Sequence, residues 1–189
     1  MNPPFIHARP LTYEQHLQRR KPGIIDLVVL HCTELPDLEA ARVLGERILY
    51  PESGSGNSGH FYIDRDGRKE QWVEMGRIAH HVKGFNERSI GIELVNLGRY
   101  PDWLHAGRQN MDEAYPEAQI NSLIDLLGWL RSNMNTLRWI AGHEDLDTER
   151  VPSSNDPASL VRRKLDPGPL FPWHRLAVEV PLQRLYLAL

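Results

Sequence analysis

Cysteine is almost absent from this chain, because Cys32 is the single cysteine among 189 residues. One cysteine cannot form an internal disulfide, so a disulfide-stapled fold is excluded. No apolar run approaches the roughly 20 residues that a membrane-spanning helix needs. The first ten residues also lack the apolar segment of a secretory signal peptide. We therefore expect a cytoplasmic protein that has no membrane partner.

An excess of positive charge is also missing, since 22 Lys and Arg residues face 25 Asp and Glu residues and the formal net charge is −3. This balance gives no electrostatic case for a nucleic-acid partner. The apolar fraction of 41% and the charged fraction of 25% are ordinary for a soluble globular protein. The length suits one domain with a sizeable core. We expect this domain over residues 23–189, after a proline-punctuated polar arm over residues 1–22.

Several short stretches have the pattern of β-strands. Residues 24–31 form an apolar, β-branched run that is typical of a buried strand, and residues 89–95 form another. Residues 60–64 and 69–74 flank an Asp-Gly pair, which predicts a β-hairpin. Residues 137–141 predict a strand that leads to His143.

Helix signals mix with these strands without strict alternation. Asp37 can cap a helix that extends to about Leu49, with Ala41, Leu44 and Ile48 on its buried stripe. Pro116 suits the first turn of the main amphipathic helix, whose apolar positions are Ile120, Leu123, Ile124, Leu127 and Met134. A terminal helix begins near Trp173, and Pro181 bends or ends it. Irregular loops are expected at residues 51–58, 97–114 and 152–159. The fold class is therefore α/β: a single domain with a central mixed sheet flanked by helices.

His31 ends the first strand, where open α/β sheets usually place their functional sites. Adjacent strand residues face opposite sides of a sheet, so His31 and Cys32 cannot both bind one ion while the strand continues. We interpret His31 as the metal ligand and Cys32 as a small buried residue. The alternative is a hydrogen-bonded core histidine, and His31 taken alone favours that alternative.

Glu93 strengthens the functional interpretation. Ile90, Ile92 and Leu94 share one face of their strand, which leaves Gly91 and Glu93 on the other face. A carboxylate within an apolar strand is costly unless a cation or hydrogen-bond donors meet it. Gly91 would leave room for a ligand to approach closely, and Glu93 is placed to act as the general base of a hydrolysis. The alternative is a solvent-facing glutamate on an edge strand.

Two further segments complete a candidate zinc site. His143 follows a strand and a glycine, and acidic neighbours are placed to orient its imidazole. Lys164 and Asp166 lie two residues apart and project from the same side if that stretch is extended. Two imidazoles and a carboxylate can hold Zn²⁺ with one position open for water, and Lys164 can stabilise the oxyanion of a tetrahedral intermediate.

The chain resembles the zinc-dependent N-acetylmuramoyl-L-alanine amidases, a family that includes phage lysozyme-type amidases, anhydromuropeptide amidases and peptidoglycan recognition proteins. Six motifs follow in family order between about residues 24 and 173, and six in register are hard to obtain by chance. They are His31-Cys-Thr, Ser58-Gly-His-Phe-Tyr-Ile-Asp-Arg-Asp-Gly67, Ala79-His-His81, Ser89-Ile-Gly-Ile-Glu-Leu94, Gly142-His-Glu-Asp145 and Lys164-Leu-Asp-Pro-Gly168.

The resemblance implies a mixed sheet with flanking helices, a zinc ion in a surface groove, and cleavage of the amide between N-acetylmuramic acid and L-alanine. It also implies the roles of particular side chains. By position, the zinc ligands are His31, His143 and Asp166, the catalytic residues are Glu93 and Lys164, the substrate contact is His81, and His60 is structural.

One departure is an insertion at residues 151–162, which separates the second histidine from the Lys-x-Asp motif. A loop of this size costs little free energy, so the zinc site can survive it, although Asp145 or Asp147 could compete as the third ligand. The substrate is expected to be peptidoglycan or its soluble muropeptide fragments, and the protein a monomer. The alternatives are a peptidoglycan-binding module without catalysis and a zinc peptidase that cuts the stem peptide.

Overall fold

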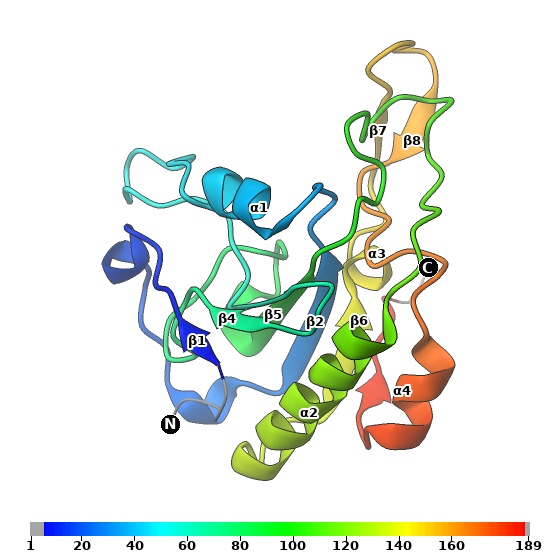
Figure 1. Cartoon of the computed structure of the whole chain (residues 1–189). Coiled ribbons are helices and arrows are strands. Elements are labelled where there is room, and N and C mark those ends of the chain that lie inside the picture. The colour runs from blue at the N-terminus through cyan, green and yellow to red at the C-terminus, as the bar shows by residue number, and fades with distance from the viewer. Residues whose placement is uncertain (1–5, 188–189) are drawn as a thin grey trace.

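A mixed β-sheet of seven strands forms the centre of the molecule (Figure 1). The computed structural model describes residues 6–187, and the statements below refer to that range. The strand order is β1-β4-β3-β5-β2-β6-β9, and every pair is parallel except the antiparallel β3–β4 hairpin. The strands are β1 (His7–Ala8), β2 (Leu27–Cys32), β3 (Phe61–Ile63), β4 (Lys69–Gln71), β5 (Ser89–Leu94), β6 (Trp139–Gly142) and β9 (Gln183–Arg184).

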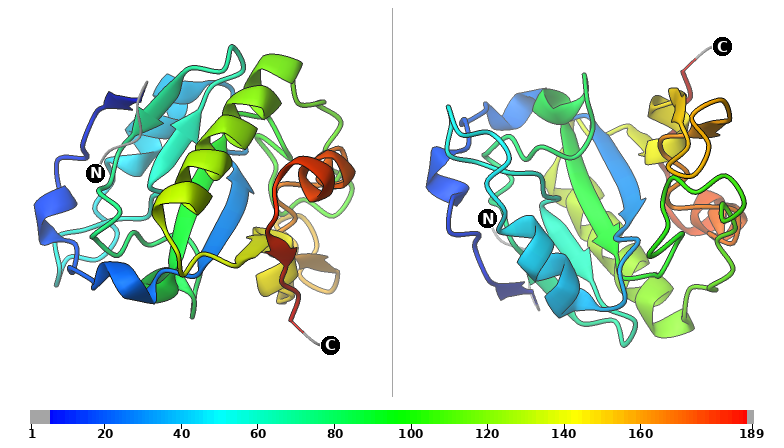
Figure 2. Two further views of the ribbon diagram at one scale, coloured as in Figure 1. Left: turned by 90° about the horizontal axis from the view of Figure 1, so that it is seen from below. Right: turned by 90° about the horizontal axis from the view of Figure 1, so that it is seen from above.

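Helices lie on both faces of this sheet, as the two views of Figure 2 show for α1 and α2. The α-helices are α1 (Leu38–Gly45), α2 (Glu117–Asn133), α3 (His143–Leu146) and α4 (Trp173–Glu179), and short 3₁₀ turns cover Glu14–His16, Pro22–Ile24 and Asn86–Arg88. The predicted fold class, one mixed sheet flanked by helices, is confirmed. No helix within residues 6–187 is both long and apolar enough to cross a bilayer.

Side chains alternate along the two central strands, and this alternation divides the core. Val28 and Leu30 of β2, with Ile90 and Ile92 of β5, pack against α2 and α4. On α2 the buried apolar residues are Ile120, Leu123, Leu126, Leu127 and Leu130, which follow helical spacing. The other face of the sheet therefore remains available for polar residues of β2 and β5.

Leu127 is fully buried in this core. We expect Leu127→Ala to lower the free energy of unfolding by about 2–5 kcal/mol, because it removes apolar contacts and leaves a cavity. Val178 is 86% exposed on α4, so Val178→Ala should stay within about 0.5 kcal/mol of the wild type. Urea unfolding of both variants measures the difference, and equal midpoints would contradict this assignment of the core.

Helix α1 differs from the prediction in its length and in its buried face. Asp37 is its N-cap as expected, and its carboxylate accepts a hydrogen bond from the Ala40 amide. The helix ends at Gly45 rather than near Leu49, and Leu44 and Ile48 are 41% and 49% exposed. The helix approaches the Trp72 ring through Gly45, where an added Cβ would lie 3.2 Å from that ring. Its buried stripe is therefore Leu38, Ala41, Arg42 and Gly45.

Other details of the secondary structure also differ from the prediction. Pro116 is the extended N-cap of α2 and not a residue of its first turn. The strand expected at residues 137–141 begins at Trp139. The insertion is not irregular throughout, because β7 (Arg150–Pro152) and β8 (Leu160–Arg162) pair as an antiparallel hairpin apart from the main sheet. The Asp-Gly hairpin is confirmed, and Gly67 at its turn has a φ of 88°.

The part of the N-terminal arm that is described, residues 6–22, packs on the main sheet. Strand β1 pairs with β4, and Leu11, Tyr13 and Leu17 are buried beside Trp72. The Arg20 guanidinium donates to the Ser89 carbonyl oxygen at 2.6 Å. The arm therefore contacts the strand that carries Glu93, while the boundary at residue 22 stays a prediction.

Candidate metal centre

Polar side chains lie together at the carboxyl ends of the four neighbouring strands β3, β5, β2 and β6. In the strand register, His31 of β2 is opposite Glu93 of β5, which is opposite Tyr62 of β3. Register partners on adjacent strands project to the same face, so these three side chains lie on the face opposite α2. Strand β6 ends at Gly142, and His143 follows as the first residue of α3.

His31, His143 and Asp166 form a compact group that we call the His-His-Asp cluster. His31 Nδ1 lies 3.0 Å from His143 Nδ1 and 3.0 Å from Asp166 Oδ2. His143 Nδ1 lies 3.1 Å from the same carboxylate oxygen. All three residues are buried, at 2%, 5% and 3% exposure. One donor atom from each residue therefore converges on a single point, as the sequence predicted.

The charge states of the cluster suit a cation. Burial lowers the pKa of His31 to about 4, so its imidazole is neutral at neutral pH. Burial by itself would raise the pKa of Asp166, but His143, His31 and Lys164 outweigh it and hold that pKa well below its usual range. The cluster thus offers a neutral imidazole and an ionised carboxylate, the forms that bind metals.

The geometry also fits a metal ion. A hydrogen bond between the two Nδ1 atoms would satisfy only that pair, whereas one cation would interact with all three facing atoms at once. The second oxygen of Asp166, Oδ1, is buried and has no hydrogen-bond partner within the described residues. The cluster is therefore able to hold one metal ion.

Asp145 and Asp147 have other partners in the structure. Asp145 Oδ2 accepts a hydrogen bond from the Gly142 amide at 2.8 Å, and the same carboxylate pairs with Arg184. Asp147 Oδ2 lies 3.9 Å from His143 Nε2, across the ring from the cluster, and pairs with Arg163. The structure thus brings Asp166, and neither of these residues, to the two Nδ1 atoms.

Glu93 lies beside His31 but is not part of the cluster. The pKa of its carboxyl group is raised to about 8, mainly by burial and also by the negative charge of Asp166, while the Lys164 side chain opposes the rise. Gly59 makes room for this side chain, because an added Cβ there would lie 2.9 Å from Glu93 Cγ. The positive charge of Lys164 thus acts on the Glu93 carboxyl group. The catalytic roles of both residues stay predictions.

His81 lies behind His31, and both of its ring nitrogens have protein partners. Its Nδ1 is 3.0 Å from His31 Nε2, and its Nε2 is 3.2 Å from Ser89 Oγ. The space above Gly91 was expected to admit a ligand, but an added Cβ there would lie 2.6 Å from the His81 ring. That expectation was wrong, because His81 fills the space. The predicted contact between His81 and substrate stays a prediction.

His60 lies outside the cluster and is fully buried. Its Nδ1 accepts a hydrogen bond from the Gly91 amide at 3.0 Å, and its Nε2 lies 3.1 Å from the Arg77 carbonyl oxygen. These contacts hold β5 against the segment that leads into β3, which is consistent with the structural role that we expected.

Sequence reasoning did not anticipate the support beneath the long loop at residues 97–114. Arg99 pairs with Glu34 in the interior, with 2.7 Å between Nε and Oε1, and donates to the carbonyl oxygens of Arg162 and Arg163. Trp103 Nε1 donates to the Glu34 carbonyl oxygen at 3.0 Å. Glu34 follows His31 by three residues, and this closeness to a proposed metal ligand was the one feature of the sequence that could have drawn attention to Glu34.

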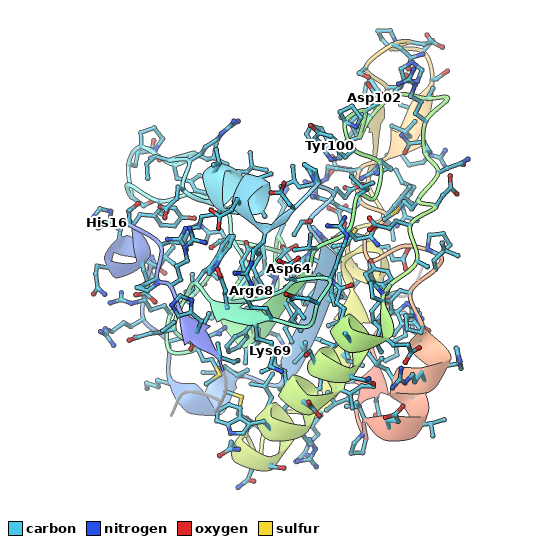
Figure 3. All side chains as sticks on the ribbon, in the orientation of Figure 1. His16, Asp64, Arg68, Lys69, Tyr100 and Asp102 are labelled. Carbon is cyan, nitrogen blue, oxygen red and sulfur yellow. The ribbon has the colours of Figure 1, made fainter. Side chains whose placement is uncertain are left out.

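The same loop also contacts the inserted hairpin, and together they form a projecting wall beside the sheet. The Ser154 amide donates to the Leu104 carbonyl oxygen, and the Ala106 amide donates to Asn155. Figure 3 shows Tyr100 and Asp102 on this wall, close to the inserted hairpin. The insertion is therefore ordered by the loop that it faces.

The fold and the cluster define a mixed α/β protein that can hold one metal ion at the carboxyl ends of its central strands. A family model described as N-acetylmuramoyl-L-alanine amidase matches residues 19–169. The endolysin of Escherichia phage T7 is 31% identical over 120 residues, which cover 63% of this chain and 75% of the endolysin. This chain belongs to the N-acetylmuramoyl-L-alanine amidase family, so the resemblance read from its motifs is confirmed.

Solved structures agree with this membership. The endolysin amidase LysCS from Clostridium intestinale matches with a TM-score of 0.67 at 20% identity, over 96% of this chain and 98% of LysCS, and shows the shared fold. Escherichia coli AmiD, solved with anhydro-N-acetylmuramic acid-L-Ala-D-gamma-Glu-L-Lys, matches with a TM-score of 0.62 at 25% identity, over 82% of this chain and 57% of the AmiD chain.

Proposed function

We propose that this protein is a zinc-dependent N-acetylmuramoyl-L-alanine amidase, which hydrolyses the amide between N-acetylmuramic acid and L-alanine. The main support is the His-His-Asp cluster at the sheet edge, with Glu93 beside it on the neighbouring strand. A carboxylate and two imidazoles favour zinc over magnesium or calcium, which prefer all-oxygen ligands. The solved complex of AmiD with a muropeptide supports the substrate class.

The chain's own residues supply the remaining chemistry. Zinc, when bound by His31, His143 and Asp166, would act as a Lewis acid and lower the pKa of water. Glu93 accepts a proton from the attacking water and returns it to the leaving amine of L-alanine. The Lys164 ammonium group stabilises the negative charge that develops on the amide oxygen. The products are a muramic acid with a free carboxylate and a peptide with a new amino terminus.

A peptidoglycan-binding module is less well supported, since the cluster and both proposed catalytic residues are all present. A zinc peptidase that cuts the stem peptide would need the same residues and differs only in the bond that it cleaves. Digestion of an anhydromuropeptide followed by mass spectrometry separates these functions. The amidase releases the intact stem peptide, a peptidase releases shorter peptides, and a binding module releases neither.

We expect the purified protein to contain about one zinc ion per chain, because its cluster provides three protein ligands to a single ion. A chelator should abolish muropeptide hydrolysis, and added zinc should restore it. Elemental analysis together with the same digestion assay checks both points. Full activity in protein that contains no transition metal would contradict the zinc assignment.

We further propose that the substrates are small soluble muropeptides and that the protein acts as a cytoplasmic monomer. The wall formed by the loop at residues 97–114 and the hairpin at residues 150–162 would border the substrate site and select among substrates. Tyr100 and Trp103 pack edge to face with 5.9 Å between ring centroids, and both are partly exposed. They are placed to contact a sugar or a peptide, while the bond from Trp103 to Glu34 also anchors the loop.

A further inference from the structure

A line of hydrogen bonds leads from the proposed metal centre back to the protein backbone. His31 Nε2 lies 3.0 Å from His81 Nδ1, and His81 Nε2 lies 3.2 Å from Ser89 Oγ. The Ser89 hydroxyl lies 2.8 Å from the carbonyl oxygen of Phe85. These contacts connect β2, the segment before the 3₁₀ turn at Asn86–Arg88, and the start of β5.

The carbonyl oxygen of Phe85, at the end of this line, determines which atom donates in each hydrogen bond. A carbonyl oxygen only accepts, so the Ser89 hydroxyl donates to Phe85 and its lone pairs face His81. The neutral His81 ring then donates through Nε2 and accepts through Nδ1. His31 must therefore carry its hydrogen on Nε2. Its Nδ1 keeps a free lone pair, which points at His143 and Asp166.

The position of the His81 ring is held from several sides. The backbone amides of His81 and Val82 donate to Asn86 Oδ1 at 3.0 and 2.7 Å. The ring packs edge to face against His31 and against His60, with 5.1 and 5.7 Å between ring centroids. Gly91 lies directly beneath it, and any larger residue there would displace it. His81 thus has little freedom to turn its nitrogens elsewhere.

We propose that His81, supported by Ser89, is a positioning residue that holds the His31 ring and fixes its hydrogen on Nε2, so that Nδ1 is free to bind the metal ion. This inference rests on the proposed zinc-dependent function. It gives His81 a role behind a metal ligand, where partners of this kind orient the ligand and increase its basicity. Direct contact with substrate is not needed to explain the presence of His81.

Two substitutions of His81 separate a positioning role from a space-filling one. His81→Phe keeps the ring and removes the acceptor, and we expect zinc affinity to fall by about 10–100-fold. His81→Asn restores an acceptor near the position of Nδ1, and we expect affinity close to that of the wild type. His80→Phe is the matched control, because the neighbouring His80 ring faces Tyr50 instead. Competition with a chromophoric chelator measures zinc affinity without an activity assay.

Nuclear magnetic resonance of ¹⁵N-labelled histidine tests the hydrogen positions directly. We expect His31 and His81 both to carry hydrogen on Nε2, with or without zinc, and Ser89→Ala to disturb this pattern at His81. Hydrogen on Nδ1 of His81 would overturn the inference. So would wild-type zinc affinity in His81→Phe, or weakened substrate binding in that variant with zinc affinity unchanged. If the wild type binds no zinc at all, the proposed function fails, while the His31 tautomer still tests the hydrogen-bond line.

Discussion

Replacing Glu93 by glutamine should lower the rate of muramoyl–alanine amide hydrolysis by about 10²–10⁴-fold, the usual contribution of a positioned general base. Glutamine has nearly the same shape as glutamate but cannot accept the proton. Glu93 lies outside the His-His-Asp cluster, so zinc content should not change. The carboxyl pKa of about 8 implies that positive charge at the cluster is needed to keep this base ionised near neutral pH.

This prediction also separates an enzyme from a binding module. Calorimetry should show that Glu93→Gln binds muropeptide like the wild type, because glutamine keeps the shape of the replaced side chain, so the loss should appear in kcat. Glu144→Gln is a suitable control, since Glu144 faces Arg184 rather than the cluster. Wild-type turnover in Glu93→Gln would remove Glu93 from the mechanism. A zinc-loaded wild type that binds muropeptide without cleaving it would replace the amidase with a recognition module.

The central strands could be predicted because burial on both faces leaves a clear pattern. Val28 and Leu30 face one side of β2, and His31 follows on the opposite face from Cys32, as strand alternation requires. The same alternation correctly predicted that Glu93 and Ile92 lie on opposite faces of β5. In the structure, the register between β2 and β5 places His31 opposite Glu93, a pairing that the pattern of neither strand predicts alone.

Helix α1 shows where this kind of inference fails. The stripe Ala41, Leu44 and Ile48 has helical spacing, but so does the stripe that is buried, and the two differ by a small rotation of the helix. The Trp72 ring selects the buried stripe because it lies against Gly45. A contact between residues so far apart in sequence cannot be read from local periodicity, which is why exposed Leu44 was mistaken for core.

The surroundings of the cluster were less predictable than its members. A histidine is conspicuous in an apolar strand, whereas Ser89 at the start of a strand has no distinguishing pattern. Its partner His81 was noticed only through the family resemblance, which does not show that both its ring nitrogens face protein atoms. Hydrogen-bond partners that support a site come from unrelated segments, so their roles emerge only when the chain is folded.

Asp166→Ala should remove most of the bound zinc and abolish hydrolysis. The carboxylate contacts the Nδ1 atoms of both histidines, at 3.0 and 3.1 Å. Without it, two buried imidazoles remain to hold the ion. The loss of zinc affinity should therefore exceed the about 10–100-fold that is typical when an outer hydrogen-bond partner is removed. Zinc content after dialysis, with circular dichroism as a check on folding, measures this effect.

The matched controls are Asp145→Asn and Asp147→Asn, which remove a charge near His143 while keeping a hydrogen-bond acceptor. Asp145 is held by Gly142 and Arg184, and Asp147 lies 3.9 Å from His143 Nε2, on the far side of the ring. Both variants should keep about one zinc ion per chain, because neither carboxylate faces the Nδ1 atoms. If Asp147→Asn or Asp145→Asn loses zinc and Asp166→Ala retains it, the inserted hairpin has redirected the metal site. Asp166 would then no longer match the third ligand of the family.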